Sequence, residues 1–305
     1  MTPRHVDAAV EPRLDWLSLT DALAAGHALP RAETRDSVLR RGEDTLLVRS
    51  AWIDGLGGLV KAATVFPGNR DRPAVNGAAS LFSDADGTLA ATIDFHLLTK
   101  WKTAGDSLLA ARRLARSDSR RILLVGAGAV AASLRDAYAA AFPDAAFEVW
   151  SRNPDRAVGF ARAYGALPIT LAVTDLARAV AEADIVACAT MATEPVLRGE
   201  WLRPGTHVDL IGAYRADMRE ADDRAIARGR LFVDSRDTTI GHIGELMDPI
   251  ARGVIGAADV VADFYDLDRF ERRSADEVTI AKNGGGAHLD LMTARHVLDR
   301  WRGSA

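Results

Sequence analysis

A strand that runs directly into a glycine-rich turn and an alanine-rich helix is the feature that most constrains this chain. Residues 122–125 are all apolar, and Gly126, Gly128 and Ala131 follow them in the pattern G-x-G-x-x-A. In such a unit the first glycine permits a tight turn, the second lets the backbone approach a diphosphate, and the small third residue keeps helix and strand close. The pattern predicts a dinucleotide site at the start of a Rossmann unit.

Glycines at a strand-to-helix turn can also have a purely structural role. The surrounding pattern has to decide between that role and a dinucleotide site. Apolar runs alternate with helical segments throughout the region beyond residue 121. Strands are expected at 122–125, 147–150, 185–189, 207–211 and 231–233, with helices at 129–142 and 154–164. Because parallel strands need a long crossover, this alternation predicts an α/β fold, a Rossmann domain with a doubly wound parallel sheet.

The choice of cofactor is expected to depend on the residues after the second strand of this domain. An NAD site carries an acidic residue there, whereas this chain has Ser151, Arg152 and Asn153. Ser151 can hydrogen-bond a 2′-phosphate and Arg152 can pair with it, so the sequence favours NADPH and leaves NADH open. The alternative is that Arg152 is a solvated loop arginine. The expected cofactor-binding residues are Lys102, Thr103, Gly126, Gly128, Ala129, Val130, Ala131, Ser151, Arg152, Asn153, Thr190, Met191 and Gly212.

The first hundred residues carry a different pattern, typical of an antiparallel sheet. Turn sequences separate apolar runs at 46–48, 58–66, 78–82 and 89–95. A helical pattern follows, and a charged break at 116–120 marks the expected boundary. We expect an α+β domain formed by residues 1–115 and 277–305, because the last helix is predicted to return to it, and a Rossmann domain formed by residues 116–276.

Composition excludes several classes of function. The 305 residues include 38 basic and 42 acidic side chains, and a formal charge of −4 offers no field that would collect nucleic acid or anionic lipid. The N-terminal segment has no long apolar run, so neither a signal peptide nor a membrane span is expected. Cys188 is the only cysteine and the 7 histidines show no ligand spacing. We therefore expect a cytoplasmic protein without a disulfide or a metal.

Lys61 stands in the middle of the otherwise apolar strand predicted at 58–66. A lysine that points into a closed site can bind a carboxylate or donate a proton, and burial lowers its pKa toward a useful range. The other interpretation is an edge lysine that protects a strand from aggregation. Taken alone, Lys61 favours the second interpretation.

Lys102 and Thr103 are predicted at the start of the helix that leads into the Rossmann domain. Helix N-terminal amides beside a lysine form an anion site suited to a carboxylate or a diphosphate. The alternative is that Asp106 or Ser107 simply caps this helix.

A second glycine-rich turn, residues 284–286, enters the last helix just before His288 and Asp290. Consecutive glycines permit close approach of the backbone to a ligand, which makes Gly285 a candidate substrate-binding residue. A flexible connector is the competing interpretation.

Five segments taken together resemble the ornithine cyclodeaminase and mu-crystallin family over nearly the whole chain. The segments are Lys61 with residues 66–69, residues 98–104, the turn at Gly126, residues 234–236 and residues 244–246. The family joins amino-acid cyclodeaminases, alanine dehydrogenases and ketimine reductases. The resemblance implies an oxidoreductase. It also implies a homodimer, because members of the family commonly bury an exposed sheet against a second subunit.

In that family an early arginine and a strand lysine hold the carboxylate of the substrate. The resemblance implies that Arg35 and Lys61 bind an imino acid in a cleft between the two domains, with Lys61 also the catalytic proton source. Most members have Arg-Thr-Ala-Ala where this chain has Lys102 and Thr103 followed by Ala-Gly. With Lys102 in place of the family arginine, a compact ammonium replaces a guanidinium that can form two parallel hydrogen bonds. Lys102 is expected to contact both substrate and cofactor.

The cyclodeaminases place an aspartate two residues after the glycine that follows the strand at 207–211, where this chain has Tyr214. This departure, with residues 217–223 and 282–286, is similar to the Δ1-pyrroline-2-carboxylate reductase branch. The implied activity is NADPH-dependent reduction of a cyclic ketimine carboxylate to L-proline or a close relative. Two alternatives stay open: ornithine cyclodeamination with recycled NAD, and a non-catalytic NADPH-binding protein.

Overall fold

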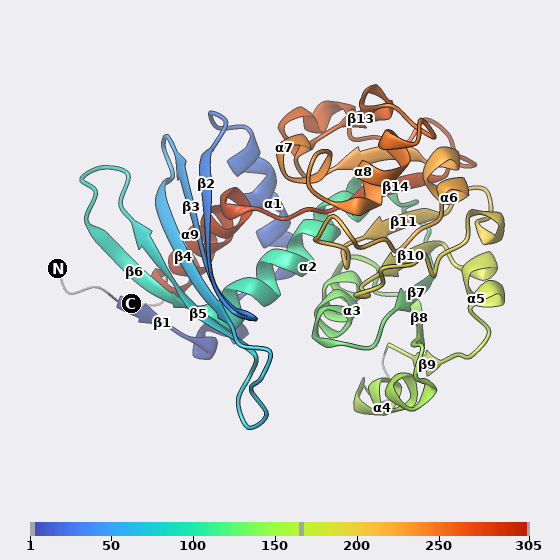
Figure 1. The fold of residues 1–305 in the computed structure, drawn as a ribbon, viewed down its shortest axis with the longest axis horizontal. Helices are drawn as coiled ribbons and strands as arrows, with labels where there is room; N and C mark the ends of the chain where they lie inside the picture. Colours follow the sequence, from blue (N-terminus) through green and yellow to red (C-terminus); the bar gives the residue numbers. More distant parts are fainter. Residues whose placement is uncertain (1–3, 165–167, 304–305) are drawn as a thin grey trace. The chain divides into compact units, whose positions relative to one another are not determined.

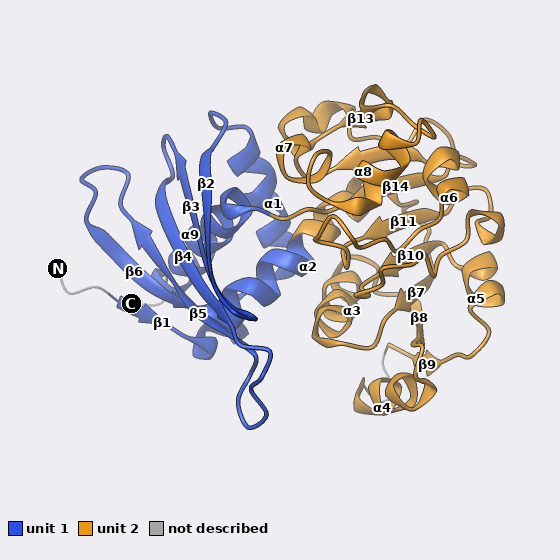
Figure 2. Ribbon diagram, in the orientation of Figure 1, with its two compact units in different colours: residues 1–105, 286–305 blue, residues 106–285 orange. Residues whose placement is uncertain are grey.

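The computed structural model describes residues 4–164 and 168–303 and contains two compact units (Figures 1 and 2). Unit 1 extends to residue 105 and resumes at residue 286, whereas unit 2 spans residues 106–285. The sequence suggested boundaries after residues 115 and 276. The first boundary instead falls inside a continuous helix, and the second falls in the glycine-rich turn at 284–286, so each unit is described separately below.

Unit 1 is built on a six-stranded sheet in the order β1-β6-β5-β4-β3-β2. Strands β2 to β6 pair antiparallel with their neighbours, as predicted, and β1 joins β6 in parallel. The strands are β1 (Arg4–Val6), β2 (Glu33–Arg41), β3 (Asp44–Ile53), β4 (Gly57–Val65), β5 (Val75–Phe82) and β6 (Leu89–Asp94). The sequence did not reveal β2, because every one of its residues is exposed and most are polar, which leaves no apolar alternation to detect.

Two helices, the first half of a third, and a 3₁₀ segment complete unit 1, since α2 continues into unit 2 after residue 105. They are the 3₁₀ segment Ala8–Arg13, α1 (Trp16–His27), α2 (Phe95–Leu114) and α9 (Ala287–Arg302). Helix α9 packs across one face of strands β2 to β5 and against α1 (Figure 1). Along β4 the side chains alternate, so that Leu59, Lys61 and Ala63 are buried while Val60 is exposed on the outer face. A buried lysine therefore lies on the covered face of this sheet.

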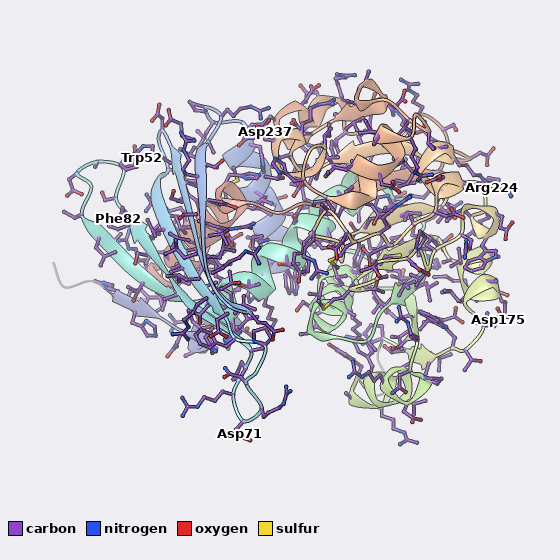
Figure 3. All side chains as sticks on the ribbon, viewed as in Figure 1. Trp52, Asp71, Phe82, Asp175, Arg224 and Asp237 are labelled. Carbon is purple, nitrogen blue, oxygen red and sulfur yellow. The ribbon has the colours of Figure 1, made fainter. Side chains whose placement is uncertain are left out.

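The outer face of the unit 1 sheet is unusually apolar for a surface that no helix covers. The large apolar side chains Leu39, Leu46, Trp52 and Val60 are exposed there. Trp52 of β3 and Phe82 of β5, labelled in Figure 3, line a hollow of about 770 Å³ on this face. Burying such a surface stabilises an assembly, which makes this face a candidate interface.

Unit 2 contains an eight-stranded sheet in the order β13-β12-β14-β11-β10-β7-β8-β9, and every pairing in it is parallel. The strands are β7 (Arg121–Val125), β8 (Ala146–Trp150), β9 (Thr170–Ala172), β10 (Ile185–Cys188), β11 (His207–Leu210), β12 (Arg230–Val233), β13 (Val260–Ala262) and β14 (Thr279–Lys282). The order reverses between β7 and β10, the switch point at which doubly wound sheets bind ligands. The predicted Rossmann fold class is confirmed.

The crossovers of unit 2 carry the helices and short 3₁₀ segments. The helices are α3 (Ala129–Ala141), α4 (Pro154–Tyr164), α5 (Leu176–Glu182), α6 (Asp223–Arg228), α7 (Arg236–Thr239) and α8 (Gly244–Ala251), and the 3₁₀ segments are Gly199–Trp201, Ala257–Asp259 and Phe264–Arg269. Among the described residues, no helix combines the length and the apolar character that crossing a membrane requires.

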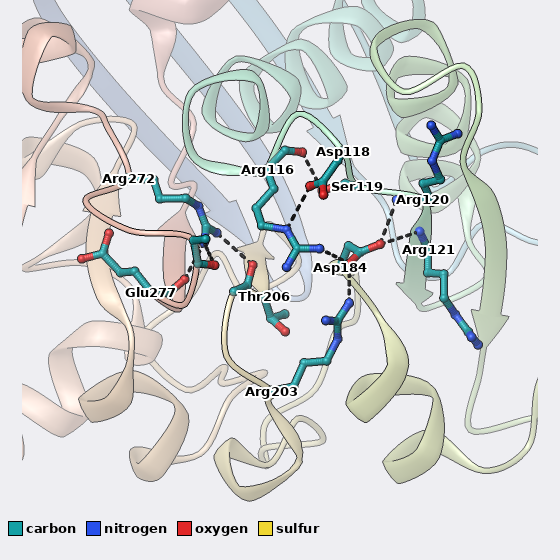
Figure 4. A network of polar contacts seen from close by, with 12 residues as sticks. Arg116, Asp118, Ser119, Arg120, Arg121, Asp184, Arg203, Thr206, Arg272 and Glu277 are labelled. Carbon is teal, nitrogen blue, oxygen red and sulfur yellow. Dashed lines mark hydrogen bonds and ion pairs between the residues drawn. The ribbon is translucent and has the colours of Figure 1, made fainter.

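Several arginines surround one carboxylate at the amino ends of the unit 2 strands (Figure 4). Asp184, one residue before β10, is bound by the guanidinium groups of Arg116 and Arg203 and by the backbone N–H groups of Arg120 and Arg121. Burial opposes ionisation of Asp184, but these donors outweigh it, so the pKa of Asp184 lies below its ordinary value. The network is structural and lies at the end of the sheet away from the glycine-rich turn.

Candidate active site

The turn after β7 is shaped for a dinucleotide. Gly126 has φ of 120°, and a Cβ on it would lie 2.5 Å from the carbonyl oxygen of Ala189, so only glycine fits. Gly128 precedes α3, offers no side-chain cap, and has no atom within 4 Å of the place a Cβ would occupy. Ala131 is fully buried against the sheet. The open backbone before an uncapped helix N-terminus fits a diphosphate, which a larger side chain would displace.

The three residues expected to select the cofactor directly follow β8, beside this turn. Trp150 ends β8 and accepts a hydrogen bond from the backbone N–H of Gly126 at 2.8 Å. Arg152 is exposed, and among the described residues it has no hydrogen bond or ion pair. Asn153 is engaged differently, because its side chain accepts from the backbone N–H of Asp155 and caps the start of α4. Ser151 and Arg152 are therefore the two side chains of this group available to a ligand.

A single buried carboxylate holds together the strand-end loops that contain Thr190 and Gly212. Thr190, after β10, donates to Oε1 of Glu220 from its backbone N–H at 2.7 Å and from its hydroxyl at 2.8 Å. The backbone N–H groups of Gly212 and Ala213, after β11, donate to Oε2 at 2.6 and 3.2 Å. Met191, next to Thr190, is 69% exposed. The sequence identified the two loops but not Glu220, because an acidic residue in a charged loop gives no signal of burial.

Glu220 sits among other buried charges. Glu245 of α8 accepts from the backbone N–H groups of Glu220 and Ala221, and the Lys282 ammonium donates to the carbonyls of Leu210, Ala213 and Asn283. Burial, followed by the charge of Glu245, raises the pKa of Glu220 to about 8. Three of the four groups that bind Glu220 are backbone N–H donors, which favour the ionised carboxylate and oppose this rise. One buried carboxyl group therefore joins the two loops, and its backbone donors favour its ionised form.

In unit 1, Lys61 occupies a buried polar site on the covered face of the sheet. The residue is 7% exposed, and its Nζ donates to Oγ1 of Thr99 at 2.9 Å and to Oδ1 of Asp290 at 2.8 Å. Burial lowers the pKa of Lys61 below its ordinary value. The interpretation of Lys61 as an exposed edge lysine is wrong, because β4 lies inside the sheet between β3 and β5.

Strand register separates Arg35 from Lys61 and brings Arg49 to the lysine instead. Arg35 pairs with Ser50, which pairs with Val60, so Arg35 belongs to the outer face and lines the hollow there. Lys61 pairs directly with Arg49, and opposed residues of an antiparallel pair share a face. The expectation that Arg35 and Lys61 hold one carboxylate together is therefore wrong. Arg49 was missed because register, which decides the face, is invisible in a single sequence.

Lys102 and Thr103 are not at a helix start. Helix α2 begins at Phe95, and the carboxylate of Asp94 accepts from the backbone N–H of Leu97 at 2.8 Å in its first turn. Lys102 thus lies in the helix interior, where backbone amides are already bonded, and the predicted helix-terminus anion site is wrong. Lys102 still acts on the site through its charge, which lowers the pKa values of both Lys61 and Asp290.

The glycine-rich turn at 284–286 is a fixed structure and not a flexible connector. The backbone N–H groups of Gly284 and Gly285 donate to Oδ2 of Asp234 at 2.9 and 2.5 Å, and Gly285 has φ of 69°. Asp234 follows β12 and is itself buried. The turn connects β14 to α9, where Asp290 lies in the first turns of the helix.

The chain is similar to known proteins over nearly its whole length. Residues 50–305 match the model of the ornithine cyclodeaminase/mu-crystallin family. A Δ1-pyrroline-2-carboxylate reductase of Paracoccus denitrificans is 54% identical over 292 residues, which cover 93% of this chain and 92% of the relative. Among solved structures, the Δ1-pyrroline-2-carboxylate reductase of Thermococcus litoralis in complex with NADH and L-proline has a TM-score of 0.90, with 23% identity over 99% of this chain and 98% of that one. An archaeal alanine dehydrogenase dimer with bound NAD has a TM-score of 0.90, with 24% identity over 100% and 97% of the two chains. The chain belongs to the ornithine cyclodeaminase/mu-crystallin family.

Proposed function

We propose that this chain is an NADPH-dependent ketimine reductase that converts Δ1-pyrroline-2-carboxylate to L-proline. The observation that carries the proposal is the pair of cations, Arg49 and Lys61, at opposed positions on one face of β3 and β4. A guanidinium and an ammonium side by side suit a small substrate with one carboxylate. The high identity to a reductase of this specificity, over nearly the whole length of both chains, supports the same substrate class.

The reaction adds a hydride to the imine carbon and a proton to the imine nitrogen, so that C=N becomes CH–NH. When bound, the reduced nicotinamide supplies the hydride. Lys61 is the residue assigned to the proton, because a buried ammonium with a lowered pKa releases one more readily than a solvated lysine. Transfer would break one N–H bond of Lys61 and form one on the imine nitrogen, and solvent would return the proton to the lysine.

The preference for NADPH over NADH rests on the segment after β8. Arg152 is exposed and unengaged among the described residues, while Ser151 adds a hydroxyl at the position where an NAD site has a carboxylate. A 2′-phosphate carries negative charge that an acidic residue there would repel, whereas Arg152 attracts it. Lys102, Thr103 and Met191 stay in the proposed cofactor-contacting set, and Gly285 stays a proposed substrate contact.

Ornithine cyclodeamination is the less favoured activity. It requires a carboxylate two residues after Gly212, where Tyr214 is 56% exposed. The nearest acidic side chain of this loop, Asp217, is tied to Arg215 at 2.8 and 3.0 Å. The loop therefore offers no unengaged carboxylate at the expected place.

We also propose that the protein is a cytoplasmic homodimer that uses the outer face of the unit 1 sheet. That face exposes Trp52 and the aliphatic side chains beside it over a hollow of about 770 Å³. The alanine dehydrogenase with the same fold is a dimer. Light scattering of the purified protein, and of Trp52→Glu, tests this: the variant is expected to shift toward monomer.

The activity is tested by following NADPH and NADH absorbance with Δ1-pyrroline-2-carboxylate, its six-membered analogue, and pyruvate with ammonia. Rapid oxidation of NADPH with a cyclic imine, and formation of L-proline, is expected. Release of ammonia from ornithine without net oxidation would select cyclodeamination instead. Tight NADPH binding without turnover of any imine would select a binding protein.

A further inference from the structure

Side chains of two helices hold the Lys61 ammonium. Thr99 of α2 accepts one of its N–H groups at 2.9 Å and Asp290 of α9 accepts another at 2.8 Å. An ammonium has three N–H donors, so one donor has no acceptor among the described residues. The Phe95 ring centroid lies 4.8 Å from Nζ, where it favours a positive charge without replacing a conventional acceptor.

This arrangement leaves little freedom to the lysine. The side chains of Lys61 and Asp290 are only 8% and 1% exposed. One N–H group is bonded to the fully buried Asp290 carboxylate and another to the half-buried Thr99 hydroxyl, so these two acceptors limit the directions open to the third. A preset donor of this kind loses less entropy on binding a ligand than a mobile surface lysine does.

Asp290 is the carboxylate that counters a group of cations. Burial lowers the pKa of Lys61, the charges of Lys102 and Arg49 lower it further, and Asp290 opposes all three. Burial likewise disfavours the Asp290 carboxylate, but Lys61 and Lys102 outweigh burial, so the pKa of Asp290 lies below its ordinary value. The Asp290 carboxylate is therefore ionised near neutral pH, and its charge favours the ammonium form of Lys61.

The other titratable groups near this pair do not compensate for a loss of Asp290. Asp36 of β2 is engaged by Arg49 at 3.1 Å. His288 of α9 lies edge-to-face with His27 of α1, and burial lowers the pKa of His288 to about 3, so its ring is neutral near pH 7. Arg31 also acts on His288 as a further cation.

We propose that Asp290 is a positioning residue that keeps Lys61 protonated and, together with Thr99, directs the remaining N–H of Lys61 toward the substrate. The inference rests on the proposed function, in which the Lys61 ammonium binds the substrate carboxylate and supplies the imine proton. Both tasks require the charged form, and without Asp290 the cations around Lys61 would favour the neutral amine.

The first test compares kcat/KM for Δ1-pyrroline-2-carboxylate at saturating NADPH in the wild type, Asp290→Asn and Asp290→Glu, from about pH 6 to about pH 10. Asp290→Asn is expected to move the high-pH loss of activity down by about one unit or more, and Asp290→Glu to restore most of it. Titration of the imine itself is common to all three proteins and cancels in the comparison. NADPH affinity, measured by fluorescence, is expected to stay within about threefold.

Thr99→Val provides a second variant that removes one acceptor and leaves the ion pair. Its KM for the imine is expected to rise by about tenfold, the equivalent of one misdirected hydrogen bond, with the KM for NADPH unchanged. Asp184→Asn is the matched control, because it removes another buried, ion-paired carboxylate, in unit 2. It is expected to lower the melting temperature without moving the pH profile.

A direct measurement separates this inference from the proposed function. The side-chain amine signal of Lys61 in isotope-labelled protein, assigned by its loss in Lys61→Met, can be titrated by NMR without any turnover. A lower Lys61 pKa in Asp290→Asn supports the inference even if the imine proves not to be the substrate. If Asp290→Asn and Thr99→Val reduce activity evenly at all pH values and the Lys61 titration does not move, Asp290 is only structural and the inference is overturned. If Asp290→Asn does not fold, an unchanged imine KM in Thr99→Val overturns it.

Discussion

Arg49 and Lys61 stand directly opposite each other on β3 and β4, whereas Arg35 faces away from both. Two neighbouring strands thus place a guanidinium and an ammonium on one covered face of the sheet. Asp36 forms a partly exposed ion pair with Arg49 and Asp290 forms a buried one with Lys61, so each cation has a carboxylate partner. The proposed substrate carboxylate would meet two neighbouring cations, of which Lys61 is buried and held by Asp290.

Arg49→Gln is expected to raise the KM for the imine by roughly ten- to a hundredfold, the loss of one charged hydrogen bond, while NADPH affinity stays near that of the wild type. Arg35→Gln should leave the imine KM within about twofold, since its side chain lies on the other face. Steady-state kinetics with both substrates decides the matter. A large effect of Arg35→Gln with none for Arg49→Gln would show that Arg35, and not Arg49, binds the substrate carboxylate.

Arg152→Ala is expected to raise the KM for NADPH by about tenfold and to leave the KM for NADH nearly unchanged, because the guanidinium acts on the 2′-phosphate alone. Ser151→Asp should reverse the preference by repelling that phosphate and binding the ribose hydroxyl of NADH. The ratio of kcat/KM for the two cofactors is the measurement. Equal losses with both cofactors would show that Arg152 does not contact the phosphate.

Alanine substitutions of the two glycines in the turn after β7 are expected to have different effects. Gly128→Ala meets no atom within 4 Å, so folding should be preserved while NADPH affinity falls by about tenfold or more. Gly126→Ala meets a carbonyl oxygen at 2.5 Å and has an unfavourable φ, so it should lose stability as well. Melting curves with and without NADPH distinguish the two. A normal NADPH affinity in Gly128→Ala would argue against a diphosphate at this turn.

Glu220→Gln is expected to weaken cofactor binding indirectly, because Glu220 is buried and joins the two loops that contain Thr190 and Gly212. The amide retains the shape of the carboxylate but turns an NH₂ group toward backbone donors of Thr190 or Gly212, which costs roughly one to three kcal/mol. We expect a lower melting temperature and a KM for NADPH higher by about tenfold. Glu194→Gln is the control, since Glu194 is exposed in the loop after β10. Equal behaviour of the two variants would remove Glu220 from any role at the loops.

Stability is expected to fall in mild acid because two buried histidines resist protonation. Burial lowers the pKa of His207 and of His288 to about 3, below the ordinary value of 6.5. The unfolded chain therefore takes up protons below about pH 6.5 that the folded protein refuses, and stability decreases from there toward pH 3. His207→Asn should show a shallower decline in melting temperature between about pH 7 and about pH 5. An identical slope would assign the acid sensitivity to other groups.

Much of unit 2 could be predicted because its signals are local. Five strands of the parallel sheet and helices α3 and α4 follow from apolar runs and helical periodicity, and the turn at Gly126 is recognised from the glycine spacing directly after an apolar strand. Strand β14 escaped prediction, because four residues ending in Lys282 do not look like a central strand. Only pairing with β11 and β12, far away in sequence, makes that lysine buried.

The sequence by itself determined the Rossmann fold and the glycine-rich turn after its first strand, since both depend on residues close together in the chain. Motifs spread along the chain indicated the family, and only through that resemblance did Lys61 become a candidate for binding the substrate. The tertiary structure decided which charges act together. The register of β2, β3 and β4 separates Arg35 from Lys61 and selects Arg49, and the packing of α9 on the sheet brings Asp290 to the lysine from 229 residues away. Strand register and long-range packing are set by burial summed over the whole fold, so no local pattern could have revealed these pairs.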